Sequence, residues 1–317
     1  MKWLPKLRFS MRTLFILVTL LCVLLVPLSV KLYQAQQQRL AVEWVRANGD
    51  FVLYDYQDGI LSSNAPTDYL WLRSILGDDF FDAVTGVFII NPTITDISQL
   101  THLQSLEKVI LDVPQKADLS PLGSLKQLDD LELTFSSEKS FTAKNIAVLS
   151  KLDCSLDIHL SGQFMDDLRP IQQLNNIRHL TIADAQVTDL APLTHLTQLE
   201  TLGIWGTPVK DISALSNLSR LKRLSLYDTQ INDISPLSDL TQLEELNFSG
   251  PNITDLTLLA KLVNLRELSL TTPKAKDLSP LEKLVNLEKL FLSDIQVPKV
   301  EIDKLKKALP NCLIIKY

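Results

Sequence analysis

The sequence is poor in the residues that most catalytic and metal sites require. It contains three cysteines and four histidines in 317 residues. It has no Walker loop, no His-Glu-x-x-His, no Gly-x-Ser-x-Gly and no Cys-x-x-Cys pair. We therefore expect a protein that is not an enzyme and that holds no cofactor and no metal ion.

An excess of basic charge is also absent. Lysine and arginine number 31 against 37 aspartates and glutamates, which gives a net charge of -6. Nucleic-acid binding usually needs a basic surface, so nucleic acid is not an expected partner. Hydrophobic residues make up 46% of the chain and charged residues 21%. This composition can fill a continuous core, and it differs from that of a disordered chain.

One long apolar segment lies near the N-terminus. From Thr13 to Val30 there are 18 consecutive residues without a charge. As a helix this segment is about 27 Å long, close to the thickness of about 30 Å of a bilayer's hydrocarbon core. The nearby basic residues are Lys2, Lys6, Arg8 and Arg12 before the segment, and Lys31, Arg39 and Arg46 after it. Because the more basic flank usually stays in the cytoplasm, we predict a single-pass membrane protein with a cytoplasmic N-terminus and everything after Val30 outside.

A cleaved signal peptide is the alternative interpretation of this segment, since it has the same basic start and apolar middle. The apolar stretch is long for a signal peptide. The residues that follow it, Lys31-Leu-Tyr-Gln-Ala-Gln, offer a poor small-x-small cleavage site. A signal anchor is therefore favoured, and cleavage remains the alternative.

A repeat of 22 residues dominates the rest of the chain. Aspartate followed by leucine or isoleucine recurs at this spacing, with one gap of 49, at Asp96, Asp118, Asp167, Asp189, Asp211, Asp233, Asp255 and Asp277. Nine residues before each aspartate stands an apolar-x-apolar pair, and two further pairs raise the number of expected strands to ten. A longer step of 27 residues, from Leu131 to Ile158, indicates an inserted loop near Ser136–Thr142.

A repeat of this length predicts an α/β solenoid, in which each repeat forms one coil. Each coil has room for one short strand whose alternate side chains point inward, and no coil can bury that face without its neighbours. The pattern Leu221-Lys-Arg-Leu224-Ser-Leu226 resembles the leucine-rich-repeat template. We therefore expect a leucine-rich-repeat solenoid with a parallel concave β-sheet and short helical turns on the convex side. The repeated aspartate is interpreted as the N-cap of each turn, often with proline in the first turn.

The resemblance can be made more specific. Repeats such as Leu237-Ser-Asp-Leu-Thr-Gln-Leu-Glu-Glu-Leu are similar to those of bacterial internalin-like proteins. The stretches Arg8-Phe-Ser-Met-Arg-Thr-Leu, Val52-Leu-Tyr-Asp-Tyr and Trp71-Leu-Arg-Ser-Ile-Leu-Gly resemble a family of membrane-anchored bacterial repeat proteins of unknown role. Together these resemblances cover almost the whole chain, and they imply a fold but no ligand and no functional residue. The sequence ends at Tyr317 without a cell-wall sorting signal, so we do not expect the internalins' route to the surface.

Five segments follow from these observations. They are a basic cytoplasmic tail (1–12), a transmembrane helix (13–30), a juxtamembrane helix with an N-terminal cap (31–86), the repeat array (87–298) and a C-terminal cap (299–317). Within the N-terminal cap we expect a helix over Lys31–Arg46, a strand over Phe51–Tyr56, a turn at Asp58-Gly59 and a helix over Asp68–Leu76.

Side chains that flank the inward pairs should point outward from the concave sheet. Trp205 and Tyr227 fall in one column on adjacent coils, Arg223 shares their face, and His179 lies at the edge of this group. Tryptophan, tyrosine and arginine are the residues most enriched at interface hot spots. A second candidate is an acidic cluster of Asp130, Glu132 and Asp157, in which the two aspartates are assigned to the same column.

We therefore predict a membrane-anchored module of the bacterial envelope that binds a protein on its concave face. Two other classes stay open at this stage. A passive structural protein of the envelope would need no defined ligand, and an enzyme would need a titratable cluster in a closed pocket. His159 and His179 are expected about 8 Å apart, too far to share one metal ion easily.

Overall fold

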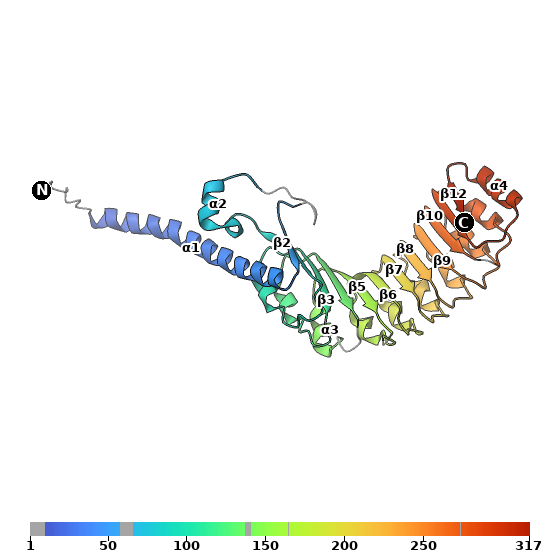
Figure 1. Cartoon of the computed structure of the whole chain (residues 1–317), viewed down its shortest axis with the longest axis horizontal. Coiled ribbons are helices and arrows are strands. Elements are labelled where there is room, and N and C mark those ends of the chain that lie inside the picture. Colours follow the sequence, from blue (N-terminus) through green and yellow to red (C-terminus); the bar gives the residue numbers. More distant parts are fainter. Residues whose placement is uncertain (1–9, 58–65, 137–140, 164, 273) are drawn as a thin grey trace.

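The protein is a curved array of coils with a long helix projecting from its N-terminal end (Figure 1). The computed structural model describes residues 10–57, 66–136, 141–163, 165–272 and 274–317. The predicted turn at Asp58-Gly59, most of the predicted basic tail and residues 137–140 of the predicted loop lie outside these ranges.

Helix α1 spans Met11–Ala47 without interruption and includes Pro27. The Ser10 hydroxyl accepts a hydrogen bond from the backbone N–H of Thr13 and so caps its start. Asn48 and Gly49 end the helix, and Gly49 adopts a positive φ of 84°. The first part of α1 is exposed, whereas Ala41, Val42 and Val45 are buried in the core of the array.

An N-terminal unit covers the first coil. Strand β1 (Phe51–Tyr54) pairs antiparallel with β2 (Val84–Ile89). Between them lie α2 (Leu70–Leu76) and the short 3₁₀ helix η1 (Asp78–Phe80). The expected second helix thus begins two residues later than its sequence suggested, because Tyr69 adopts a left-handed conformation with φ 55°.

All strands after β2 add to one sheet in chain order, and each is parallel to the one before it. They are β3 (Lys108–Val113), β4 (Asp130–Phe135), β5 (Ser155–Ser161), β6 (Ile177–Ala183), β7 (Thr201–Trp205), β8 (Arg223–Tyr227), β9 (Glu245–Ser249), β10 (Glu267–Thr271), β11 (Lys289–Ser293) and β12 (Leu313–Lys316). The strands follow the inner curve of the array and the helical turns follow the outer curve (Figure 1).

Short 3₁₀ helices occupy the convex side of most coils. They are η2 (Ser98–His102), η3 (Ser120–Ser124), η5 (Arg169–Gln173), η6 (Ala191–His195), η7 (Ser213–Asn217), η8 (Ser235–Asp239), η9 (Thr257–Lys261) and η10 (Ser279–Lys283). Each of the eight repeated aspartates accepts a hydrogen bond of 2.8–3.0 Å from the backbone N–H two residues later. The prediction that the aspartate is the N-cap was wrong by one residue, because the leucine or isoleucine after it holds that position. The aspartate instead forms an Asx turn just before each 3₁₀ helix.

The strand spacing between β4 and β5 corrects the sequence prediction. Leu131 pairs with Leu156 and Leu133 with Ile158, so the step is 25 residues rather than 27. Both strands carry three alternating apolar residues, and the sequence could not show which pairs lie opposite each other. Helix α3 (Ala143–Leu149) replaces the 3₁₀ turn here, and a bulge at Leu156/Asp157 restores the usual pairing with β6.

The core runs the length of the array, as a stack of inward-facing leucines requires. Leu224, Leu226, Leu246 and Phe248 are at most 1% exposed, and each belongs to an apolar pair predicted from the repeat. At the C-terminal end, α4 (Lys299–Ala308) packs Ile302 and Leu305 into the core, and β12 adds the last strand.

Candidate binding surface

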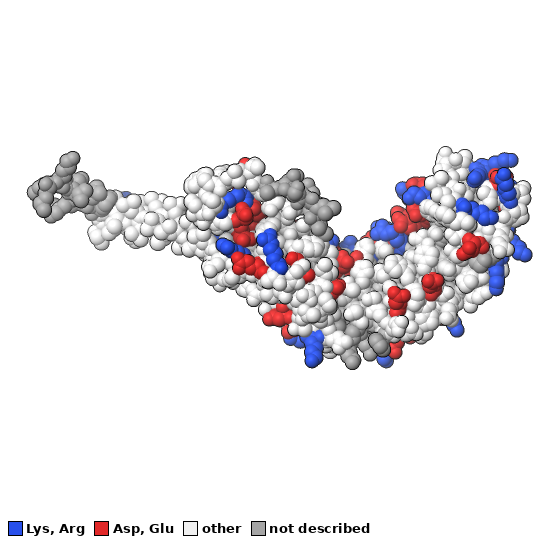
Figure 2. Space-filling model, in the orientation of Figure 1, with Lys and Arg blue, Asp and Glu red and all other residues white. Residues whose placement is uncertain are grey.

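The outward side chains of the concave sheet form continuous rows. One row contains, in strand order from β4 to β11, Glu132, Asp157, His179, Thr201, Arg223, Glu245, Glu267 and Lys289. Neighbouring members are about 4.8 Å apart, the usual spacing of strands. Acidic and basic side chains gather along this inner curve toward the C-terminal end (Figure 2). The surface is therefore polar, with charges of both signs.

This row changes the grouping that the sequence suggested. Asp157 lies opposite Glu132, and Asp130 lies opposite Ser155. The prediction that Asp130 and Asp157 share a column was wrong, because β5 is displaced by two residues relative to β4. As a result, Glu132, Asp157, His179 and Arg223 stand in one line.

Trp205 and Tyr227 are direct partners across β7 and β8, as predicted. Trp205 is 43% exposed, and its indole N–H donates to the Ser225 hydroxyl at 2.9 Å. Its ring lies over Gly203, where an added Cβ would come within 3.2 Å of the ring. The Tyr227 hydroxyl instead reaches Ser269 at 3.1 Å. Ser225 and Ser269 belong to one outward column of the sheet, so both side chains lean across the sheet toward that column.

Arg223 begins β8 beside this pair and is exposed. Its Nε donates to the Thr201 hydroxyl at 3.2 Å, which directs the guanidinium along the row. Glu245 is its partner on the next strand. An arginine held in this way keeps other N–H groups free for a carboxylate or a carbonyl of a ligand.

The acidic cluster includes basic groups that the sequence prediction left out. His159 Nε2 lies 3.5 Å from Glu132 Oε1 and 3.4 Å from Asp157 Oδ1. Lys108 Nζ lies 2.6 Å from Asp130 Oδ2. Because charges of both signs alternate here, the cluster resembles a polar interface more than an open anionic site.

Asp157 is the most buried of the three acids, with 27% of its side chain exposed. Its Oδ1 is enclosed and accepts no hydrogen bond from the described residues. Burial raises the pKa of this carboxyl, and the nearby Asp130 raises it further, whereas His159 and His179 lower it. The ionised form is therefore costly in the fold.

We expect Asp157→Asn to raise the melting temperature at pH 7. A pKa that is raised in the folded state favours the protonated carboxyl. The stability that protonated Asp157 contributes is therefore fully present below the ordinary pKa of 3.8, and it is lost as the pH rises through the raised folded-state pKa. The gain over the unsubstituted protein should therefore shrink as the pH falls toward 4. Asp153→Asn is the control, because Asp153 is exposed. A gain that grows at acidic pH would contradict this account.

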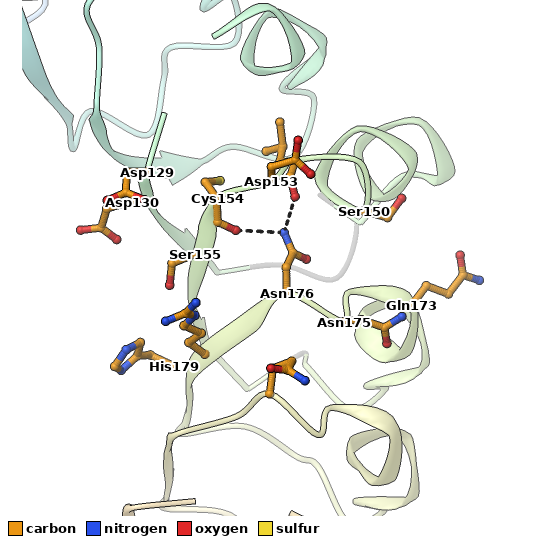
Figure 3. A pocket seen from close by; sticks show the side chains of 13 residues that line it. Asp129, Asp130, Ser150, Asp153, Cys154, Ser155, Gln173, Asn175, Asn176 and His179 are labelled. Atoms are coloured by element: carbon orange, nitrogen blue, oxygen red, sulfur yellow. Dashed lines mark hydrogen bonds between the residues drawn. The ribbon is translucent and has the colours of Figure 1, made fainter. Parts of the chain in front are cut away.

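A hollow of about 710 Å³ opens at one side of the sheet, where the coil with α3 meets its neighbours (Figure 3). Its acidic lining residues are Asp129, Asp130 and Asp153, and its basic ones are Arg178 and His179. Asn176 lies in the wall of the hollow, and its side-chain Nδ2 donates to the backbone carbonyls of Leu152 at 3.0 Å and Cys154 at 3.3 Å. The hollow adjoins the outward row, since His179 is a member of the row and also lines the hollow.

Within the described ranges, no group of three or more histidine, cysteine, aspartate or glutamate side chains is placed to hold a metal ion. Burial raises the pKa of the Cys154 thiol to about 11, so it stays protonated at neutral pH.

Comparison with known proteins agrees with this geometry. A family model described as leucine-rich repeats in two copies matches residues 197–240 and 219–256. The chain contains leucine-rich repeats. No curated protein matches this leucine-rich-repeat chain.

Solved structures similar to the leucine-rich-repeat chain include internalins. An internalin (inlF) from Listeria monocytogenes is 27% identical with a TM-score of 0.52, and the match covers 71% of this chain and 72% of that one. Internalin C2 from the same organism is 27% identical with a TM-score of 0.45, covering 66% and 80%. A leucine-rich-repeat protein from Leptospira interrogans is 18% identical with a TM-score of 0.42, covering 71% and 82%. The repeats resemble those of the internalin inlF.

Sequence reasoning missed three participants in this surface. His159 was not joined to Glu132 and Asp157, since the displacement of β5 hid that proximity. Lys108 lies directly opposite Asp130 in the regular register, so the 22-residue spacing could have found that pair. Ser225 was seen only as a small exposed residue, although it fixes the Trp205 ring. A serine directly beside an aromatic column is the signal that could have found it.

Proposed function

We propose that this protein is a membrane-anchored, non-enzymatic module of the bacterial envelope that binds a protein ligand on its concave face. The observation that carries the proposal is the uninterrupted outward row from Glu132 to Lys289, flanked by Trp205 and Tyr227. Solenoids commonly present extended binding surfaces on their concave side. Similarity to the Listeria internalin supports the bacterial setting.

Helix α1 supports the membrane part of the proposal. Among the described residues it is the helix long and apolar enough to cross a bilayer, and its most apolar 18 residues are not buried against the protein. The core helix of a soluble protein would be buried, so the exposure of this segment favours a membrane span. A signal sequence passes the same test, and the two are separated by experiment.

A topology reporter tests this placement. An enzyme active only in the cytoplasm, fused after Tyr317, should be silent, whereas the same reporter placed before Met1 should be active. Strong activity of the C-terminal fusion would contradict the predicted orientation. Recovery of a soluble mature chain that begins near Lys31 would instead establish cleavage and remove the anchor.

Crosslinking in intact envelopes tests the binding role. A photo-crosslinking residue at Ser225, beside the Trp205 ring, should capture one partner in a fixed ratio. The same residue at Ser216 in η7, a half-buried serine on the convex side, is the matched control. Labelling of many proteins alike from both positions would contradict the proposal and favour a passive structural role.

A further inference from the structure

Helix α2 carries an apolar face that no described part of the chain covers. Leu70 is 64% exposed, Trp71 67% and Ile75 70%. At 100° per residue these three side chains, with Ser74, occupy one side of the helix. Large apolar residues grouped on one exposed face commonly mark an interaction site.

The opposite side of α2 is fixed firmly to the protein. Arg73 Nη2 donates to Asp82 Oδ1 at 2.8 Å, and both side chains are about nine-tenths buried. The Arg73 guanidinium also lies 5.0 Å from the centre of the Phe81 ring. The exposed face is therefore held in one orientation and cannot turn inward.

The position of α2 next to α1 indicates which environment surrounds this apolar face. Lys31, the first residue after the apolar segment, places its Nζ 4.6 Å from the centre of the Phe80 ring in η1. Farther along α1, Gln38 Nε2 donates to the Asp82 carbonyl at 2.8 Å. The α2–η1 unit thus lies beside residues 31–38, immediately next to the end of the proposed span (Figure 1).

We propose that the face formed by Leu70, Trp71 and Ile75 rests in the headgroup region of the same bilayer that α1 crosses. This inference rests on the proposed membrane anchor. Tryptophan and tyrosine favour membrane interfaces, and Tyr33, two residues after Lys31 on α1, is also exposed. The face itself carries no charged residue, and exposed Asp68 precedes α2, so its attachment depends on apolar contact and not on anionic lipid.

The test uses the full chain in phosphatidylcholine vesicles with Trp71 as the single tryptophan. A lipid with a spin label just below its headgroup should quench most of the Trp71 emission. The matched control keeps Trp205 alone, which lies on the concave face, and its emission should be unchanged. Ile75→Glu should reduce the quenching of Trp71, whereas Val285→Glu, at an equally exposed valine, should not.

A tryptophan within the span separates failure of this inference from failure of the anchor. In the chain with no other tryptophan, Leu20→Trp should be quenched by a spin label at the end of the lipid tail. Quenching of Leu20→Trp without quenching of Trp71 overturns the α2 contact and leaves the anchor intact. Absence of quenching at both positions overturns both. If Trp71 is shielded from an aqueous quencher but is not quenched by the lipid label, the face contacts protein, and the proposed bilayer contact is overturned.

Discussion

Replacing Leu246 with alanine should lower the free energy of unfolding by about 2–5 kcal/mol, the range for a buried leucine reduced to alanine. Leu246 is fully buried in β9 and lies between Leu224 and Leu268 on the adjacent strands. The cavity would therefore open in a stack where each coil supports the next, and the surrounding strands cannot close it. Urea unfolding monitored by circular dichroism measures the change.

Asn247→Ala is the control for this prediction. Asn247 is the next residue of β9, but it points out of the concave sheet and is partly exposed. Its replacement should change stability by no more than about 0.5 kcal/mol. Equal loss at both positions would show that the inward and outward sides of β9 have been exchanged.

Alanine at Trp205, Tyr227 or Arg223 should weaken ligand binding, with the largest loss at Trp205. Removal of a tryptophan anchor typically costs about 2 kcal/mol or more, which corresponds to a Kd about thirtyfold higher. Once the partner is captured, isothermal titration calorimetry measures the change. The melting temperature should barely move, because all three side chains lie outside the core.

Ser293→Ala is the matched control, since Ser293 stands in the same outward column at the far end of the sheet. It should leave the affinity unchanged. If all three variants bind as tightly as the unsubstituted protein, the site lies elsewhere. Asp130, Glu132 and Asp157 are then the next positions to replace.

Most of the solenoid could be predicted from the sequence because its coils repeat. The pairs Leu224/Leu226 and Leu246/Phe248 show the alternation of a strand, and their spacing of 22 residues places them side by side. The predicted strand pairing was wrong where the 22-residue spacing is interrupted. Between β4 and β5 the three apolar residues Leu156, Ile158 and Leu160 allowed two pairings, and sequence spacing alone chose the wrong one.

The residues of the candidate surface were predictable from the sequence, but their arrangement was less so. Direct pairing of Trp205 with Tyr227 follows from the repeat. The direction of each ring does not, because it depends on hydrogen bonds to Ser225 and Ser269. Proximity of His159 to two carboxylates likewise required the true pairing of β5.

The continuity of α1 determines how far the array can reach. From Lys31 to Ala47 the helix rises about 25 Å at about 1.5 Å per residue, and its last turns are embedded in the core of the first coil. A flexible linker would allow the concave face to occupy a wide volume, but this continuous helix is rigid and restricts the position of the array. With the proposed membrane anchor, an array mounted in this way would sample a thin layer at a nearly constant height above the bilayer. Partners confined to that layer would meet it at high local concentration, and partners outside it would have to extend toward it.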